Sequence, residues 1–268
     1  MTSQEEDSDL AISNEADKRL SPYLFDLSWR EVRDLLPTVK LAIIPTGSTE
    51  QHGPNGTLEV DTGRAREFSK RLGERLYPNA LVTPCVQFGM SSHHMHFPGT
   101  ITLSFDTYIG LLMDIATSLH EHGISRFLFL NGHGGNKHAL GIVVARLRHE
   151  LGVRAAWISP TSIVADIVSR LVKSETSGHA CESEMSQCMY LCPQTVKYKT
   201  LEKGAIKNSA LAKRYMSVGS QEGIFWEEVT ENGALGDARL ATYEMGQELV
   251  ETSLERLEAY ARLLMKEE

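Results

Sequence analysis

Five residues of the types that bind transition metals follow short apolar runs of the sequence, in stretches rich in small residues. They are Glu50, His52, Asp61, His94 and His133. Imidazole and carboxylate groups are typical ligands of Zn, Mn and Fe. Glu50 and His52 lie two apart, so an extended chain points both to one face, and a carboxylate such as Asp61 can bridge two ions about 3.5–4 Å apart. The spacing therefore predicts a site for one or two divalent metal ions.

Each stretch alone has a simpler interpretation. A Glu-x-His sequence is usually a solvated surface loop, and the glycines around His133 are typical of an ordinary turn. The metal site is favoured because acids and histidines occur together after three successive predicted strands. His94 and His96 are candidates for contact with a substrate, although His96 fits a polar loop equally well.

A further stretch, Gly178–Glu184, precedes a predicted helix. His179 is the candidate catalytic residue, because a neutral imidazole can take a proton from water and return it to a leaving nitrogen. Glu184 is a candidate metal ligand. The alternative is that Ser177 or Ser183 caps a helix whose first turn favours acids.

Apolar runs alternating with amphipathic segments define the expected fold. The predicted strands are residues 39–44, 80–85, 126–130 and 153–159. The predicted helices are residues 62–76, 106–122 with Asp106 as N-cap, 140–151 ended by Gly152, 163–172, 182–191 and 245–264. Residues 198–240 show no clear period. This alternation predicts an α/β fold with a mainly parallel sheet, helices on both faces and the ligand site at the carboxyl ends of the strands.

Composition excludes several classes of function. The 268 residues carry a net charge of −8 and no block of Lys or Arg, which argues against binding to nucleic acid or an anionic membrane. No apolar run approaches the roughly 20 residues of a membrane span, and the acidic N-terminus is unlike a signal peptide. We therefore expect a cytoplasmic protein that acts on a small molecule, with a loosely docked or disordered arm over residues 1–20 and one domain over residues 21–268.

Several motifs together resemble the creatininase family, also called creatinine amidohydrolases. The matching pieces are Gly47–Pro54 with Asp61, Ser91–Thr100, Asn131–Asn136, His179–Ser186, and Gly236–Asp237 with Ala241–Thr242. They occur in the family's order over about residues 22–265. The resemblance implies a three-layer α/β/α sandwich, a site for two divalent ions (Zn, Mn or Fe), a cytoplasmic location and a homo-oligomer, often a hexamer.

The resemblance also implies roles for individual residues. Glu50, His52, Asp61 and His133 become metal ligands, with Asp61 between the two ions, and His179 becomes the acid/base candidate.

Two departures from the family pattern bear on the second metal and on the substrate. Creatininases resemble Asn-Gly-His-x-Glu-Asn at the third loop, where their Glu serves the second metal, but this chain has Gly135 at that place. We therefore expect Glu184 to substitute as ligand. Residues 173–178 lack an aromatic residue to cover flat creatinine, which argues against creatinine as the substrate.

The sequence thus predicts a metal-dependent hydrolase of a small cyclic amide, a formamide or a small peptide bond. Hydrolytic ring opening of an oxidised cyclic sugar or inositol is the alternative reaction. Two alternatives are not enzymes: a homologue that binds metal or ligand without turnover, and a structural scaffold.

Overall fold

Four parallel strands form the central sheet of the protein, whose computed structural model describes residues 21–216 and 223–266. The strands are β1 (Leu41–Thr46), β2 (Ala80–Val82), β3 (Arg126–Asn131) and β4 (Arg154–Ile158), in the order β2-β1-β3-β4. β1 pairs with both β2 and β3, with Ala42 opposite Leu81 on one side and Phe127 on the other. All four predicted strands are confirmed. They read as continuous apolar runs because a parallel sheet is buried on both faces.

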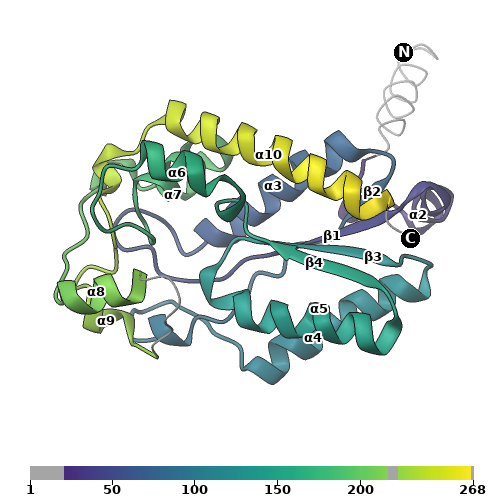
Figure 1. Ribbon diagram of the computed structural model, residues 1–268, viewed down its shortest axis with the longest axis horizontal. Helices are drawn as coiled ribbons and strands as arrows, with labels where there is room; N and C mark the ends of the chain where they lie inside the picture. Colours follow the sequence, from purple (N-terminus) through teal and green to yellow (C-terminus); the bar gives the residue numbers. More distant parts are fainter. Residues whose placement is uncertain (1–20, 217–222, 267–268) are drawn as a thin grey trace, which may run out of the picture.

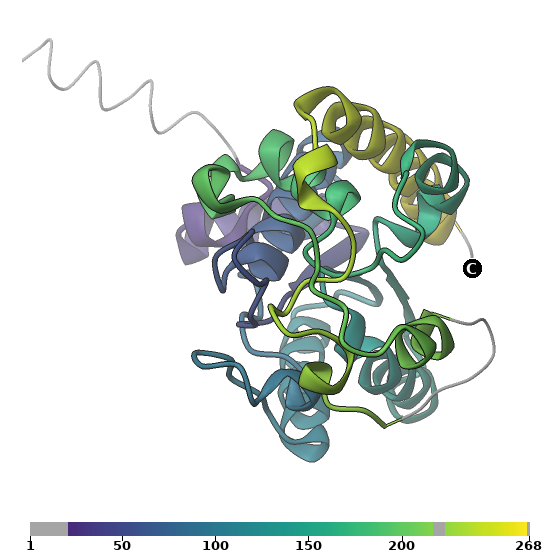
Figure 2. The ribbon, with the colours of Figure 1, turned by 90° about the vertical axis from the view of Figure 1, so that its left-hand side faces the viewer.

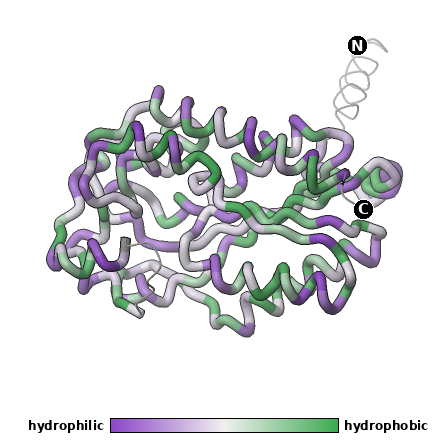
Figure 3. Tube along the Cα trace, viewed as in Figure 1, coloured by the Kyte–Doolittle hydropathy of each residue, from purple (hydrophilic) through white to green (hydrophobic). Residues whose placement is uncertain are grey.

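Helices cover both faces of this sheet (Figure 1). One layer contains α3 (Val60–Leu76), α6 (Ala165–Leu171), α7 (Glu182–Leu191) and α10 (Tyr243–Lys266), and the other contains α4 (Phe105–Glu121) and α5 (Lys137–Leu151). Alternate residues of β1 divide between the two layers: Leu41 and Ile43 join the core under α3 and α10, whereas Ala42 and Ile44 join the core under α4 and α5. The strands form the apolar centre of the molecule in Figure 3. The predicted three-layer α/β/α architecture is confirmed.

The remaining elements are short. They are α2 (Trp29–Leu35), α8 (Ser209–Met216) and α9 (Trp226–Val229), with 3-10 turns at Leu24–Asp26, Leu36–Thr38, Ser92–His94, Gly134–Asn136, Ser162–Val164, Pro193–Thr195, Tyr198–Thr200 and Ala238–Leu240. α8 and α9 lie in the stretch that shows no period in the sequence, because four to eight residues are too few to reveal one. The expected arm over residues 1–20 lies outside the described residues, and its boundary with a single domain stays a prediction.

One predicted helix boundary is wrong. Asp106 is not the N-cap of α4, because the Ser104 side chain accepts the hydrogen bond from the Thr107 amide at 3.2 Å. Asp106 lies within the first turn, where its charge still suits the positive end of the helix dipole.

The loops that follow β1 and β3 leave the same end of the sheet, and α8 and α9 lie beyond that end (Figure 1). Figure 2 faces this end of the molecule. The carboxyl ends of parallel strands are where α/β folds place their ligands, so the predicted site residues are brought to one place.

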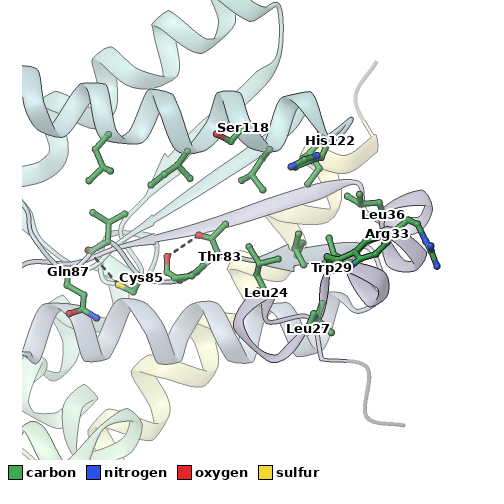
Figure 4. A pocket seen from close by; sticks show the side chains of 18 of the residues that line it. Leu24, Leu27, Trp29, Arg33, Leu36, Thr83, Cys85, Gln87, Ser118 and His122 are labelled. Atoms are coloured by element: carbon green, nitrogen blue, oxygen red, sulfur yellow. Dashed lines mark hydrogen bonds between the residues drawn. The ribbon is translucent and has the colours of Figure 1, made fainter. Parts of the chain in front are cut away.

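A separate apolar cavity of about 1090 Å³ lies beside β2, between α2 and α4 (Figure 4). Leu24, Trp29 and Leu36 line one side of it and Ser118 and His122 the other. None of the predicted metal-site residues lines this cavity. Within the described ranges, no helix is both long and apolar enough to span a membrane.

Candidate metal centre

The structure brings together the four metal ligands that the family resemblance implies and the further candidate ligand Glu184. Glu50 and His52 follow β1, Asp61 lies in the first turn of α3, His133 follows β3, and Glu184 lies in the first turn of α7. The first four are 1–5% exposed. Acidic side chains are buried this deeply almost only when they are paired or bind a metal, so the cluster requires a functional explanation.

Asp61 lies between the two imidazoles of the cluster. Its Oδ2 is 3.0 Å from His133 Nδ1, and its Oδ1 is 3.5 Å from His52 Nε2. His52 Nε2 is also 3.6 Å from Glu184 Oε2, and His133 Nε2 is 3.3 Å from Glu50 Oε2. Each imidazole therefore faces two carboxylates, and both share Asp61.

The cluster fits divalent metal ions. Glu50 Oε2, His52 Nε2 and Asp61 Oδ2 are buried without a hydrogen-bond partner among the described residues. Two tetrahedral ligands, each about 2.1 Å from one ion, lie about 3.4 Å apart, which matches the separations of these atoms. Glu50, His52 and Asp61 also form a group whose donor atoms lie within 4.8 Å of one another. The arrangement leaves open donor atoms where ions would be held.

Charge in the cluster is shared between carboxylates and imidazoles. Burial opposes charge on His52, but Asp61 and Glu184 outweigh it and raise the pKa of His52 to about 9. Burial likewise opposes charge on His133, yet Glu50 and Asp61 raise its pKa to about 9. Burial, opposed by His133, raises the pKa of Glu50 to about 7. Despite burial, His52 and His133 hold the pKa of Asp61 well below its usual range.

Glu184 is held in place from both sides. The buried Arg64 guanidinium donates to Glu184 Oε1 at 2.6 Å, and the Ala180 amide donates to Glu184 Oε2 at 2.7 Å. Ala180 has a φ of 51°, a left-handed conformation that costs free energy for a residue with a side chain. This conformation directs the amide toward Glu184, so the carboxylate is fixed with Oε2 facing His52.

The loop that follows β3 has no room for a side chain at Gly135. A Cβ atom there would collide with the Met90 carbonyl oxygen and lie 2.5 Å from His133 Nε2. The glutamate of creatininases therefore has no room at this position. The carboxylate that approaches His52 comes instead from α7.

His179 reaches the cluster with a defined tautomer. Its Nε2 lies 2.8 Å from the Gln51 main-chain oxygen, which can only accept, so Nε2 carries the hydrogen. Nδ1 then holds the lone pair and lies 3.7 Å from Glu50 Oε1. Burial lowers the pKa of His179 well below its usual value, which keeps the imidazole neutral. A neutral nitrogen that faces the cluster can accept a proton.

The two candidate substrate contacts lie in different environments. His94 is buried beside the cluster, with Nε2 3.4 Å from Glu50 Oε1, and forms a possible metal-binding group with Glu50 and His179. His96 is not brought to the cluster; its side chain is 56% exposed and pairs with Glu227. The 3-10 turn Ser92–His94 rotates the chain, so the two histidines do not share a face.

Three residues of the site were not predicted from the sequence. The Gln51 amide nitrogen donates to His94 Nδ1 at 2.7 Å, while the Gln51 main-chain oxygen accepts from His179 Nε2 at 2.8 Å, so this one residue contacts both rings. Trp226 packs over the same rings, with centroids 4.7 Å from His94 and 5.2 Å from His179. Arg64 orients Glu184. Gln51 is adjacent to Glu50 in sequence, which is a usable signal, but no pattern connects Trp226 to a loop some 130 residues earlier.

The sequence model of the creatininase family, described as creatinine amidohydrolase, matches residues 25–261. The chain belongs to the creatininase family. A mycofactocin precursor peptide peptidase of Mycolicibacterium smegmatis is 33% identical over 221 residues, which cover 81% of this chain and 82% of the relative. A 3-dehydro-scyllo-inosose hydrolase of Thermotoga maritima is 26% identical over 91% of this chain and 84% of its own length. This chain is therefore a hydrolase of the creatininase family.

Solved creatininase structures share the fold. A crystal structure of creatinine amidohydrolase superimposes with a TM-score of 0.78 at 23% identity and covers 93% of this chain and 100% of its own. Other solved creatininases of the same fold include a manganese form and a Zn–Zn form. The fold predicted from the sequence is thus the creatininase fold.

Proposed function

We propose that the protein hydrolyses an amide C–N bond of a small substrate, with two divalent ions, Zn, Mn or Fe, in the cluster. The observation that carries the proposal is the set of buried, unpartnered donor atoms on Glu50, His52 and Asp61. Glu50, Asp61 and His133 would hold one ion, and His52, Asp61 and Glu184 the other. The manganese and Zn–Zn creatininases support these metals. The peptidase relative supports an amide bond as the bond that is broken.

Bound ions lower the pKa of water and polarise a carbonyl oxygen. The chain's own residues supply the rest of the reaction. His179 Nδ1 accepts a proton from the attacking water while Nε2–H stays bonded to the Gln51 carbonyl. The water oxygen bonds to the carbonyl carbon, the C–N bond breaks, and His179 returns the proton to the departing nitrogen. Trp226 is buried against the His179 ring, which limits the access of bulk water to that ring.

The alternative reaction is hydrolytic ring opening of a keto-inositol, supported by the inosose hydrolase relative. Creatinine is disfavoured because no aromatic side chain lies in residues 173–178 to cover a flat ring. The homohexamer and the cytoplasmic location stay predictions.

Elemental analysis of protein purified without added metal tests the site, followed by a hydrolysis screen. The screen contains creatinine, a formamidopyrimidine, a cyclic amide, short peptides and a keto-inositol. We expect about two transition ions per chain and turnover of an amide substrate. Absence of metal after reconstitution contradicts the site, and turnover of the keto-inositol alone selects the alternative.

Two variants assign roles to the side chains. Glu184→Gln should remove about one ion per chain and most of the activity, whereas Glu74→Gln, an exposed change on α3, should alter neither. His179→Ala should keep both ions and lose rate. A protein that only binds its ligand would tolerate His179→Ala with no change in ligand affinity and no turnover to lose.

A further inference from the structure

A polar cavity of about 480 Å³ opens next to the cluster, beside His133 and Glu184. Serine and threonine predominate in its wall, and we call it the serine-rich cavity. The hydroxyl residues are Ser159, Thr161, Ser162, Ser169, Ser174, Ser177 and Ser183. Among its lining residues, only Val168, Val172 and Cys181 are apolar apart from glycines, and none is Phe, Tyr or Trp. The cavity therefore suits a strongly polar group rather than a flat ring or an apolar side chain.

Gln187 provides a buried hydrogen-bond donor to this cavity. The side chain lines the cavity, the residue is 1% exposed, and Nε2 has no partner among the described residues. The orientation of the amide is fixed, because Oε1 accepts from Arg64 Nη2 at 2.9 Å and a guanidinium only donates. A buried donor without a partner costs free energy, so this amide group is suited to an acceptor on a bound molecule.

Lys137 adds a positive charge at the same cavity. It is the first residue of the 15-residue helix α5, where the main-chain amides and the helix dipole favour an anion. Lys137 is exposed and forms no ion pair within the described part of the chain. The neighbouring Gly134 has open space around it. A molecule that lies over Gly134 can thus meet both Lys137 and the cluster.

We propose that the serine-rich cavity binds a carboxylate of the substrate through Gln187 Nε2 and the Lys137 ammonium. The substrate class is then a small amide with a free carboxylate, such as a short peptide or an N-acyl amino acid. This inference rests on the proposed function, because it places the scissile amide at the cluster beside the cavity.

The charges of the cavity wall favour a single anionic group. Arg64 and Glu184 neutralise each other at 2.6 Å. His133 faces Glu50 and Asp61 of the cluster. The remaining charged side chains of the wall are Lys137 and Glu175, and both are exposed. Gln187 lies on the buried side with a donor and no free acceptor, which favours an anion over a cation beside it. The Glu175 carboxylate lies at the exposed rim and repels an anion. Replacement of Glu175 by a neutral residue should therefore strengthen binding of the carboxylate.

Calorimetric titration of the metal-loaded protein with N-acetylglycine and with N-acetylglycinamide tests the inference. The two probes differ only in the carboxylate. We expect the acid to bind at least about tenfold more tightly, as a charge-assisted hydrogen bond predicts. Lys137→Met and Gln187→Glu should each weaken binding of the acid about tenfold and leave the amide unchanged. Glu175→Gln should strengthen binding of the acid.

Lys70→Met, an exposed lysine of α3, is the matched control and should behave as wild type. Equal affinity for acid and amide overturns the inference, and so does acid binding that survives both Lys137→Met and Gln187→Glu, since the carboxylate then sits on the metals. If circular dichroism shows that Gln187→Glu is unfolded, Lys137→Met decides alone.

Hydrolysis measured on the wild type keeps the two proposals separate. Acid-selective binding without turnover of any amide refutes the proposed function and leaves the carboxylate site. Turnover of amides with no preference for the acid form refutes the carboxylate site and leaves the function.

Discussion

Metal binding should release about two protons per chain near pH 7.5. In the metal-free cluster the pKa values of His52 and His133 are raised to about 9, so both rings carry a proton at pH 7.5 that an ion must displace. Between about pH 8.5 and pH 7.5, where Glu50 is mostly ionised, lowering the pH by one unit therefore weakens each ion about tenfold. The loss for both ions is about 2.7 kcal/mol per pH unit, since one pKa unit corresponds to about 1.36 kcal/mol. Affinity thus rises with pH up to about pH 9 and levels off above it.

Calorimetric titration of the metal-free protein with Mn²⁺, in two buffers that differ in ionisation enthalpy, counts the protons directly. His52→Gln should lower the count by about one, and His149→Gln, an exposed change on α5, should leave it at about two. A release below about half a proton, or a count that His52→Gln does not change, refutes the assignment of charge in the cluster.

Two further substitutions test how the cluster is positioned. Gly135→Ala should displace His133, because the new Cβ would lie 2.5 Å from His133 Nε2. We expect this variant to bind less metal in elemental analysis and to be less stable by about 1–3 kcal/mol. Gly134→Ala is the control: a Cβ atom there meets open space, so its metal content should be unchanged. Gln51→Leu should lower kcat about 10–100-fold because His94, whose ring packs against His179, loses the hydrogen bond to its Nδ1; an unchanged kcat in steady-state assays of the metal-loaded variant contradicts this role.

The sequence predicted the parts of this structure that depend on local pattern. The apolar runs of β1 and β3 are long and bounded by glycine or proline, so the strands and their parallel arrangement could be inferred. Glu50 and His133 follow these strands directly, so their convergence required only the rule that carboxyl ends of parallel strands meet.

The parts that failed depend on tertiary contacts or on competition between similar residues. Ser104 and Asp106 are both good N-caps within one turn, and sequence preference does not decide between them. Trp226 reaches the cluster from a four-residue helix, which is too short to produce a period. The outward rotation of His96 results from a 3-10 turn that has no sequence signature comparable to a capping box.

The proposed roles of Glu184 as a metal ligand and of Gln187 as a donor to the substrate depend on the same neighbour, Arg64. With glycine at position 135 the third loop packs directly against Met90, and no carboxylate projects from it. A carboxylate from α7 can then approach His52 only if its charge is neutralised in the buried wall, which Arg64 does at 2.6 Å. The same Arg64 fixes the orientation of Gln187 and leaves Nε2 without a partner. The proposed metal ligand and the proposed donor toward the substrate are therefore both held by one buried guanidinium. Loss of Arg64 should impair both together, whereas loss of Lys137 should impair only recognition of the carboxylate.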